Sequence, residues 1–183
     1  MEKINQAEIN QLETSRLLLR KFVEDDVEDI YSSWCSDPEV TAMVTWTPHK
    51  DLEETKRVLK AWLKAYGNPK TVRFGIVLKE TGELIGIIDT VNFHSGKPEI
   101  GFCLARKCWG NGYMTEACHA MIRHLFHLGY NNILACTHEE NIGSIAVLQR
   151  CGFRFDKKEF RAQWSPLKLE TVVLNWYHLS KYE

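Results

Sequence analysis

Apolar and polar positions along this chain of 183 residues repeat in two different periods. Short apolar or alternating runs bounded by turn residues predict strands, and these runs are residues 17–22, 72–78, 84–91, 99–105, 132–136, 153–160 and 169–179. Apolar residues that recur every three or four positions predict helices, and these cover residues 24–35, 51–66, 114–128 and a shorter stretch after residue 141. Early helices, a central meander and later strand–helix–strand units together predict an α/β (α+β mixed) fold: one mixed sheet with helices on both faces.

Between the 99–105 strand and the 114–128 helix lies a short loop with two glycines, Gly110 and Gly112. Glycines at this spacing allow a tight turn that exposes successive backbone N–H groups, and the start of a helix attracts an anion. A diphosphate is therefore the expected ligand of the loop. The alternative is an ordinary strand-to-helix turn, which explains the two glycines equally well. The loop lacks the Gly-Lys-Ser/Thr ending of a P-loop, and Thr115 stands where a dinucleotide-binding fingerprint needs a third glycine.

A second segment follows the 132–136 strand. Asn141 is a good residue to begin a helix, and Gly152-Phe153 supplies a plausible helix end with an apolar anchor. Together the two segments resemble the GCN5-related N-acetyltransferase (GNAT) superfamily, in its pyrophosphate loop and its Asn-x-x-Ser…Gly-Phe element. The forms Trp-Gly-Asn-Gly-Tyr-Met-Thr-Glu-Ala and Asn-Ile-Gly-Ser-Ile, and the opening residues 12–20, look most like the RimJ/RimL branch of ribosomal-protein N-terminal acetyltransferases. The resemblance covers about residues 12–180 and implies a single domain over residues 1–183.

The resemblance implies a mostly antiparallel sheet, splayed between the strands that hold Glu99 and Ile133 so that the pantetheine arm of acetyl-CoA can enter. It also implies acetyl-CoA as co-substrate, and these cofactor-binding residues: Phe102, Cys103, Leu104, Lys107, Cys108, Trp109, Gly110, Asn111, Gly112, Tyr113, Met114, Thr115, Asn141 and Ser144. Pyrophosphate would be held by the main-chain N–H groups of residues 107–113. Lys107 departs from the Gln or Arg of the family motif; it can act as a point charge but lacks the planar fork of Arg.

Two residues are candidates for catalysis. A Glu at the position of Glu99 is thought to deprotonate the amine in relatives of the RimJ/RimL type; the alternative is an edge-strand glutamate that faces solvent. Strand alternation places Glu99 and Cys103 on one face, and Ile100 and Leu104 on the other. Ser144 is the candidate hydrogen-bond donor to the departing CoA sulfur, because Leu148 stands where many members of the superfamily have a Tyr; the alternative is a serine that only caps its helix.

The family resemblance implies direct attack of a primary amine on the thioester. The RimJ/RimL branch favours a protein N-terminal α-amine as acceptor, while a small-molecule amine (polyamine, aminoglycoside or amino-acid-like) remains an alternative. A non-catalytic acyl-CoA-sensing domain is a further alternative, although retention of both candidate catalytic residues argues against it. The expected acceptor-binding residues are Trp46, Asp89, Asn92 and Glu99.

Composition excludes several other classes. The net charge of −1 gives no support for a nucleic-acid footprint, no apolar run is long enough to span a membrane, and residues 1–6 lack the apolar core of a signal peptide. The six cysteines form no Cys-x-x-Cys pair, so we expect reduced thiols in a cytoplasmic protein. The histidines and carboxylates lack metal-ligand spacing, and we expect no metal. The oligomeric state is left open between monomer and homodimer.

Overall fold

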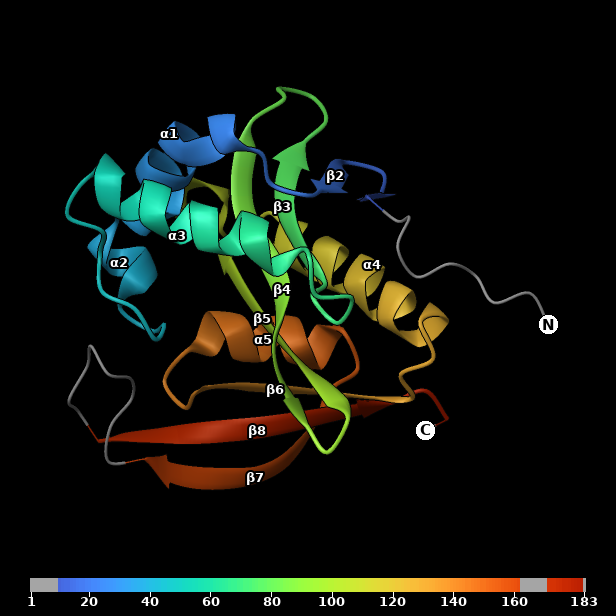
Figure 1. The fold of residues 1–183 in the computed structure, drawn as a ribbon. Helices are drawn as coiled ribbons and strands as arrows, with labels where there is room; N and C mark the ends of the chain where they lie inside the picture. The colour runs from blue at the N-terminus through green and yellow to red at the C-terminus, as the bar shows by residue number, and fades with distance from the viewer. Residues whose placement is uncertain (1–9, 162–170, 183) are drawn as a thin grey trace.

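One eight-stranded sheet organises the molecule (Figure 1). The computed structural model describes residues 10–161 and 171–182. The strand order is β1-β2-β3-β4-β5-β6-β8-β7, and neighbouring strands are antiparallel except β5 and β6, which are parallel. The strands are β1 Gln11–Glu13, β2 Leu17–Arg20, β3 Arg73–Leu78, β4 Leu84–His94, β5 Lys97–Leu104, β6 Asn132–His138, β7 Arg154–Arg161 and β8 Val172–Ser180. The expected mixed, mostly antiparallel sheet is thus confirmed.

Four of the five α-helices in the described residues lie near the predicted segments, and α2 is the exception. They are α1 Val27–Ile30, α2 Pro38–Thr41, α3 Leu52–Ala65, α4 Tyr113–His127 and α5 Ile142–Arg150. The predicted 24–35 helix is irregular: a 3-10 turn (Glu24–Asp26) precedes α1, and a wider π turn (Tyr31–Cys35) follows it.

A short strand and a short helix were not predicted from the sequence, because three or four residues are too few to show a period. They are the strand β1 and the helix α2. The helix α2 begins at Pro38, and the side chain of Asp37 caps it by accepting a hydrogen bond from the main-chain N–H of Glu39. The first two residues of the predicted 169–179 strand lie outside the described residues. So does Trp164, which as a tryptophan would be expected in the core or at its rim.

Helices cover both faces of the sheet, as predicted (Figure 1). Residues of α4 and α5, such as Met121 and Leu148, pack with one core, while Ile30 of α1 and Leu59 of α3 pack with the other. On β5 the predicted alternation is confirmed, since Ile100 and Leu104 belong to the α4 side and Cys103 to the opposite side.

The sheet opens between β5 and β6. Within the described part of the chain, these two strands are paired at a single position, Glu99 with Leu134, whereas β4 and β5 stay paired from Gly86 to His94. The parallel strands β5 and β6 then lead into α4 and α5, respectively. Because the carboxyl ends of parallel strands meet at one edge of a sheet, the glycine loop and the start of α5 lie on either side of the opening. This is the splay that the family resemblance implied.

Candidate active site

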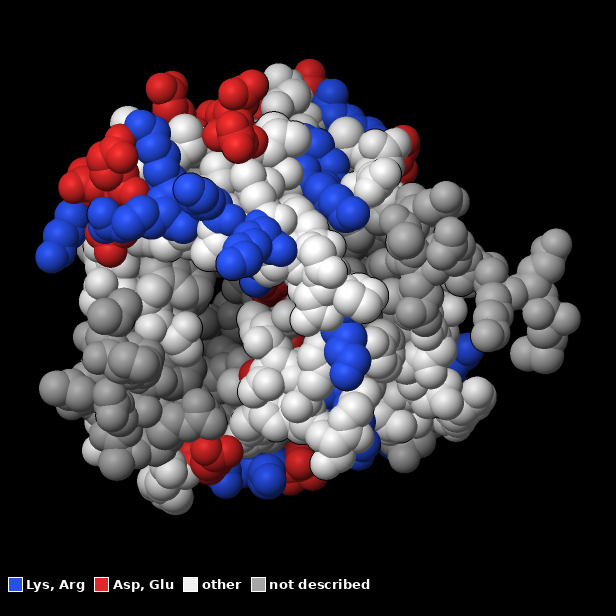
Figure 2. All heavy atoms as spheres, in the orientation of Figure 1, with Lys and Arg blue, Asp and Glu red and all other residues white. Residues whose placement is uncertain are grey.

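The opening in the sheet belongs to a cavity of about 1060 Å³. Its walls come from the glycine loop, the start of α5, the strands β4 and β5, and the loop that follows α2. In the view of Figure 2 the surface is hollowed below a row of Lys and Arg side chains, a row that lies over α3 in Figure 1. One continuous space of this size can hold two reactants side by side.

The glycine loop has the geometry of an anion cradle. Gly110 and Gly112 have φ of 79° and 77°, in the left-handed region that favours glycine. Gly112 is the residue that caps the start of α4, and it supplies no side-chain cap. The first N–H groups of α4 are therefore left for an anion.

Side chains of the loop hold its shape. The indole N–H of Trp109 donates to the carbonyl of Leu104 at 2.8 Å, and the Asn111 amide donates to the carbonyls of Cys108 and Trp109 at 3.3 and 3.1 Å. Most of the predicted cofactor-binding residues line the cavity: Phe102, Cys103, Leu104, Cys108, Trp109, Gly110, Gly112, Tyr113, Met114, Thr115, Asn141 and Ser144.

Lys107 and Asn111 are not among the described residues that line the cavity. The Lys107 ammonium is exposed and forms an ion pair with Glu83, which raises the pKa of the lysine. Its predicted role as a point charge for phosphate would require it to leave this partner.

At the start of α5, Asn141 caps the helix as predicted. Its side-chain oxygen accepts a hydrogen bond from the main-chain N–H of Ser144 at 3.0 Å. The side chain that caps this helix is thus that of Asn141, and Ser144 contributes its main-chain N–H to the cap. Leu148, one turn further along, is buried in the core.

Glu99 is 8% exposed, and its carboxylate lies in the cavity between two neighbouring strands. His94 Nε2 lies 2.6 Å from its Oε2, and the Cys136 thiol donates to its Oε1 at 3.2 Å. The alternative of an edge-strand glutamate that faces solvent is wrong, because β6 continues the sheet beyond β5. Neither partner could be predicted from the pattern along the chain, because both lie on strands other than that of Glu99.

The other predicted acceptor-binding residues, Trp46, Asp89 and Asn92, also line the cavity. Asp89 forms an ion pair with Arg73 at 2.7 Å, and the two side chains are 10% and 15% exposed. Burial raises the pKa of Asp89, and Arg73 opposes that rise. Among the other tryptophans, Trp34 is fully buried and Trp62 packs on Phe22, which agrees with core positions.

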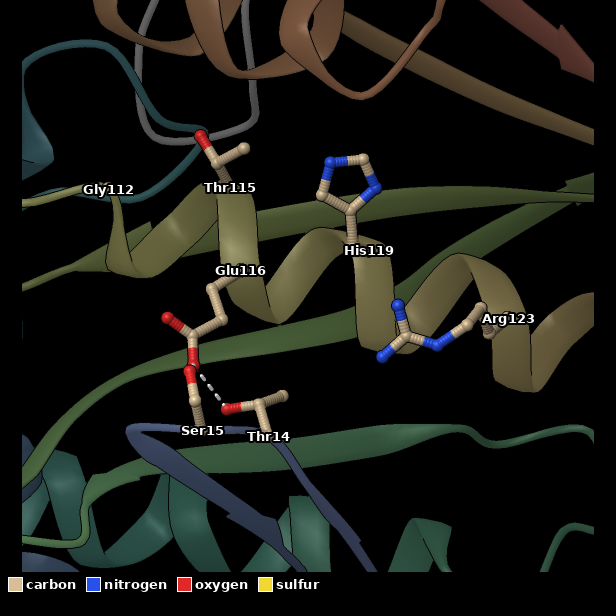
Figure 3. Close-up of a pocket in the computed structure, with 7 residues that line it drawn as sticks. All are labelled: Thr14, Ser15, Gly112, Thr115, Glu116, His119 and Arg123. Carbon is tan, nitrogen blue, oxygen red and sulfur yellow. Dashed lines mark hydrogen bonds between the residues drawn. The ribbon is translucent and has the colours of Figure 1, made fainter.

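Sequence reasoning also missed a carboxylate beside the loop, that of Glu116 in the first turn of α4. A smaller hollow of about 470 Å³ lies along this side of α4, between the helix and the turn that holds Thr14 and Ser15 (Figure 3). Glu116 accepts hydrogen bonds from the hydroxyls of Thr14 and Ser15, and from the main-chain N–H and the guanidinium of Arg16. Arg16 also donates to the carbonyl of Asn111 at 3.0 Å, so this network ties the β1–β2 turn to the glycine loop.

Glu116→Gln is expected to lower the free energy of unfolding by about 1–3 kcal/mol near neutral pH, because these donors lose an ionised acceptor. Burial by itself would raise the pKa of Glu116, but the hydrogen bonds from Thr14, Arg16 and Ser15 outweigh it and bring the pKa down to about 2. A folded-state pKa below the ordinary value means that the stabilisation is present above about pH 4.5. It is lost as the pH falls through about 2.

Urea denaturation at pH 7 and at pH 3 checks this prediction. The difference between the wild type and Glu116→Gln should shrink at the lower pH. Glu53→Gln is the matched control, because Glu53 is an exposed first-turn glutamate of α3 that pairs only at the surface with Lys56. Equal losses in the two variants at both pH values would contradict the role of the network.

Residues 10–161 and 171–182 contain no group of three or more His, Cys, Asp or Glu side chains that could hold a metal ion. In the same ranges no helix is both long and apolar enough to cross a membrane. All six cysteines lie in the described ranges, and none of them forms a disulfide there.

Comparison with known families decides the class of protein. The family model described as an acetyltransferase (GNAT) domain matches residues 16–154. The chain belongs to the GNAT family. An uncharacterized N-acetyltransferase named p20, from Bacillus licheniformis, is 34% identical over 146 residues, which are 78% of this chain and 82% of p20.

Solved acetyltransferase structures share the fold. The microcin C7 self-immunity acetyltransferase MccE, in complex with acetyl-CoA and AMP, is 17% identical with a TM-score of 0.81, over 91% of this chain and 93% of MccE. RimL, the ribosomal L7/L12 α-N-protein acetyltransferase, is 18% identical with a TM-score of 0.80, over 91% of each chain. This chain is therefore a GNAT N-acetyltransferase, an enzyme of a family that uses acetyl-CoA.

Proposed function

We propose that this GNAT enzyme transfers the acetyl group of acetyl-CoA to the α-amine of a protein or peptide N-terminus. One observation carries the proposal: a single cavity joins the glycine loop, the opening between β5 and β6, and the carboxylate of Glu99. An enzyme for direct transfer must hold a thioester and an amine in contact and must provide a base for the amine.

In this proposal the loop 107–113 binds the pyrophosphate of acetyl-CoA through main-chain N–H groups. The left-handed glycines and the uncapped start of α4 support this role. The opening between β5 and β6 admits the pantetheine arm, with Phe102 and Leu104 on one side of it and Asn141 on the other. Ser144 stands at the start of α5, where its hydroxyl can donate to the sulfur that leaves. A CoA thiol resembles a cysteine thiol, with a pKa of about 8.5, so a hydrogen bond is sufficient help for the leaving group.

Glu99 removes the proton from the acceptor ammonium, directly or through a water molecule. Its burial beside the splay supports this role, because a carboxylate there lies where the thioester and the amine would meet. An N-terminal α-amine has a pKa of about 7.7–8.0, so one carboxylate suffices as its base.

The charges of the cavity support an α-amine over a polycation. Four carboxylates of the described residues line the cavity, those of Glu39, Asp89, Glu99 and Glu140. Asp89 is already neutralised by Arg73, and Glu39 forms an ion pair with Arg106. A polyamine or aminoglycoside carries several positive charges and would call for several unpaired carboxylates. Aromatic side chains such as Trp46 and Trp176 line the same region and suit the first side chains of a peptide.

The test is release of free CoA thiol from acetyl-CoA against a panel of N-terminal peptides, amino acids, polyamines and aminoglycosides, after calorimetric titration with acetyl-CoA, CoA and NAD. We expect binding of acetyl-CoA and CoA but not NAD, and thiol release with N-terminal peptides. Release only with a small-molecule amine would replace the proposed acceptor. Binding of CoA without release on any acceptor would point to a sensing domain.

Ser144→Ala is expected to lower kcat by about 5–30-fold while the Kd for acetyl-CoA stays within twofold, since a lost hydrogen bond to a developing thiolate costs about 1–2 kcal/mol. Stopped-flow thiol release and calorimetry provide the two numbers. Ser32→Ala is the control, because Ser32 is exposed and is not among the residues that line the cavity. If Kd and kcat worsen together, Ser144 serves the structure of α5 and not the leaving group.

A further inference from the structure

Glu99 has a hydrogen-bonding partner on each of its two carboxylate oxygens, and the two partners come from different strands. His94, at the end of β4, lies 2.6 Å from Oε2, and Cys136, in the middle of β6, donates to Oε1 at 3.2 Å. A carboxylate accepts at about four lone-pair sites, so two such contacts fix its plane and leave accepting capacity for an amine.

His94 is itself held in place. Its ring meets Trp176 of β8 edge-on, with ring centroids 5.2 Å apart, and the indole N–H of Trp176 donates to Glu159 Oε2 at 2.7 Å. Immediately after His94 the chain makes a tight turn through Ser95 and Gly96, with φ of 50° and 81°. These contacts restrict both the backbone and the ring of His94.

Cys136 reaches Glu99 from the far side of the sheet opening. The two strands that hold these residues are paired only at Glu99 and Leu134 within the described part of the chain, so β6 separates from β5 beside this contact. The Cys136 thiol therefore ties the carboxylate to the half of the sheet that carries α5, while His94 ties it to the half that carries the glycine loop.

We propose that His94 and Cys136 are positioning residues that clamp the carboxylate of Glu99 toward the acceptor amine. The proposal rests on the proposed function, because it assumes that Glu99 is the base. Proton transfer to a carboxylate depends steeply on geometry, and a displacement of about 1 Å can cost about 10²-fold in rate. Two residues on two other strands thus set the direction of one catalytic group.

The test compares variants that remove each partner with variants that keep a donor. His94→Leu and Cys136→Ala are expected to lower kcat by roughly 10–100-fold and 3–10-fold, with the KM for acetyl-CoA within twofold of the wild type. His94→Gln places an N–H near the position of Nε2, and Cys136→Ser keeps a donor, so both should recover most of the lost kcat. His127→Leu, an exposed histidine of α4, is the control.

A double-mutant cycle tests whether the clamp acts through Glu99. In a Glu99→Gln background, His94→Leu should cause no further loss of kcat. Additive losses of kcat in the double variant would overturn the proposal. Wild-type kcat in both His94→Leu and Cys136→Ala, with a lowered kcat in Glu99→Gln, would also overturn it. Unchanged kcat in Glu99→Gln alone would instead overturn the role of Glu99 in the proposed function, which keeps the two failures apart. Urea denaturation of every variant identifies losses that come from unfolding.

Discussion

Glu99→Gln is expected to lower kcat by about 10²–10³-fold near neutral pH, the usual contribution of a positioned general base. The substitution keeps the size of the side chain but removes the group that takes the ammonium proton. The new side-chain amide also places an N–H donor near His94 and Cys136, which themselves donate hydrogen bonds to the carboxylate in the wild type. The measurement is the steady-state rate of thiol release at saturating acetyl-CoA and acceptor.

The pH dependence of Glu99→Gln separates loss of a base from loss of binding. Below the pKa of the acceptor, an enzyme without its base depends on the small fraction of free amine, and that fraction rises about tenfold per pH unit. The deficit of the variant should therefore be largest at low pH and should shrink above about pH 8. A pH–rate profile parallel to that of the wild type would reject the role of base. Glu80→Gln, in the exposed β3–β4 turn, is the matched control.

Gly112→Ala is expected to raise the Kd for acetyl-CoA by about 10–100-fold. With φ of 77°, Gly112 lies in the left-handed region, where a side chain costs roughly 1–2 kcal/mol. The added Cβ would find only ordinary contact, at 3.6 Å from the Arg16 guanidinium, so the strain lies in the backbone. The chain relieves it by rotating residue 112, and this turns the N–H groups at the start of α4 away from the pyrophosphate. Each hydrogen bond to a charged group is worth about 1.5–3 kcal/mol.

Gly82→Ala is the control for this prediction. Gly82 has nearly the same φ, 74°, and lies in the β3–β4 turn with nothing within 4 Å of an added Cβ. Both variants should lose a similar free energy of unfolding, measured by urea denaturation, but only Gly112→Ala should lose affinity in calorimetry. Unchanged affinity in Gly112→Ala would contradict the assignment of the loop as the pyrophosphate site.

Much of the fold could be read from local patterns. The periods of α3 and α4 and the alternation on β5 predicted these elements to within a few residues, because each buries one face against the sheet. Local patterns did not predict the irregular helical segment before Ser36 or the three-residue strand β1. Tertiary contacts, and not a local period, decide the form of both segments.

The sequence by itself determined the glycine loop, the capped start of α5 and the family. These are local features: a left-handed turn needs glycine at Gly110 and Gly112, and Asn141 needs only the N–H of Ser144 three residues later.

Only the tertiary structure decided which side chains surround Glu99, because His94 and Cys136 reach it across strand pairings. It also decided that Lys107 pairs with Glu83. In the same way it decided that Glu116 pairs with Arg16, which lies on a turn about a hundred residues earlier in the chain. Contacts between distant segments depend on sheet order and on the splay, and neither of these leaves a periodic signal in the chain.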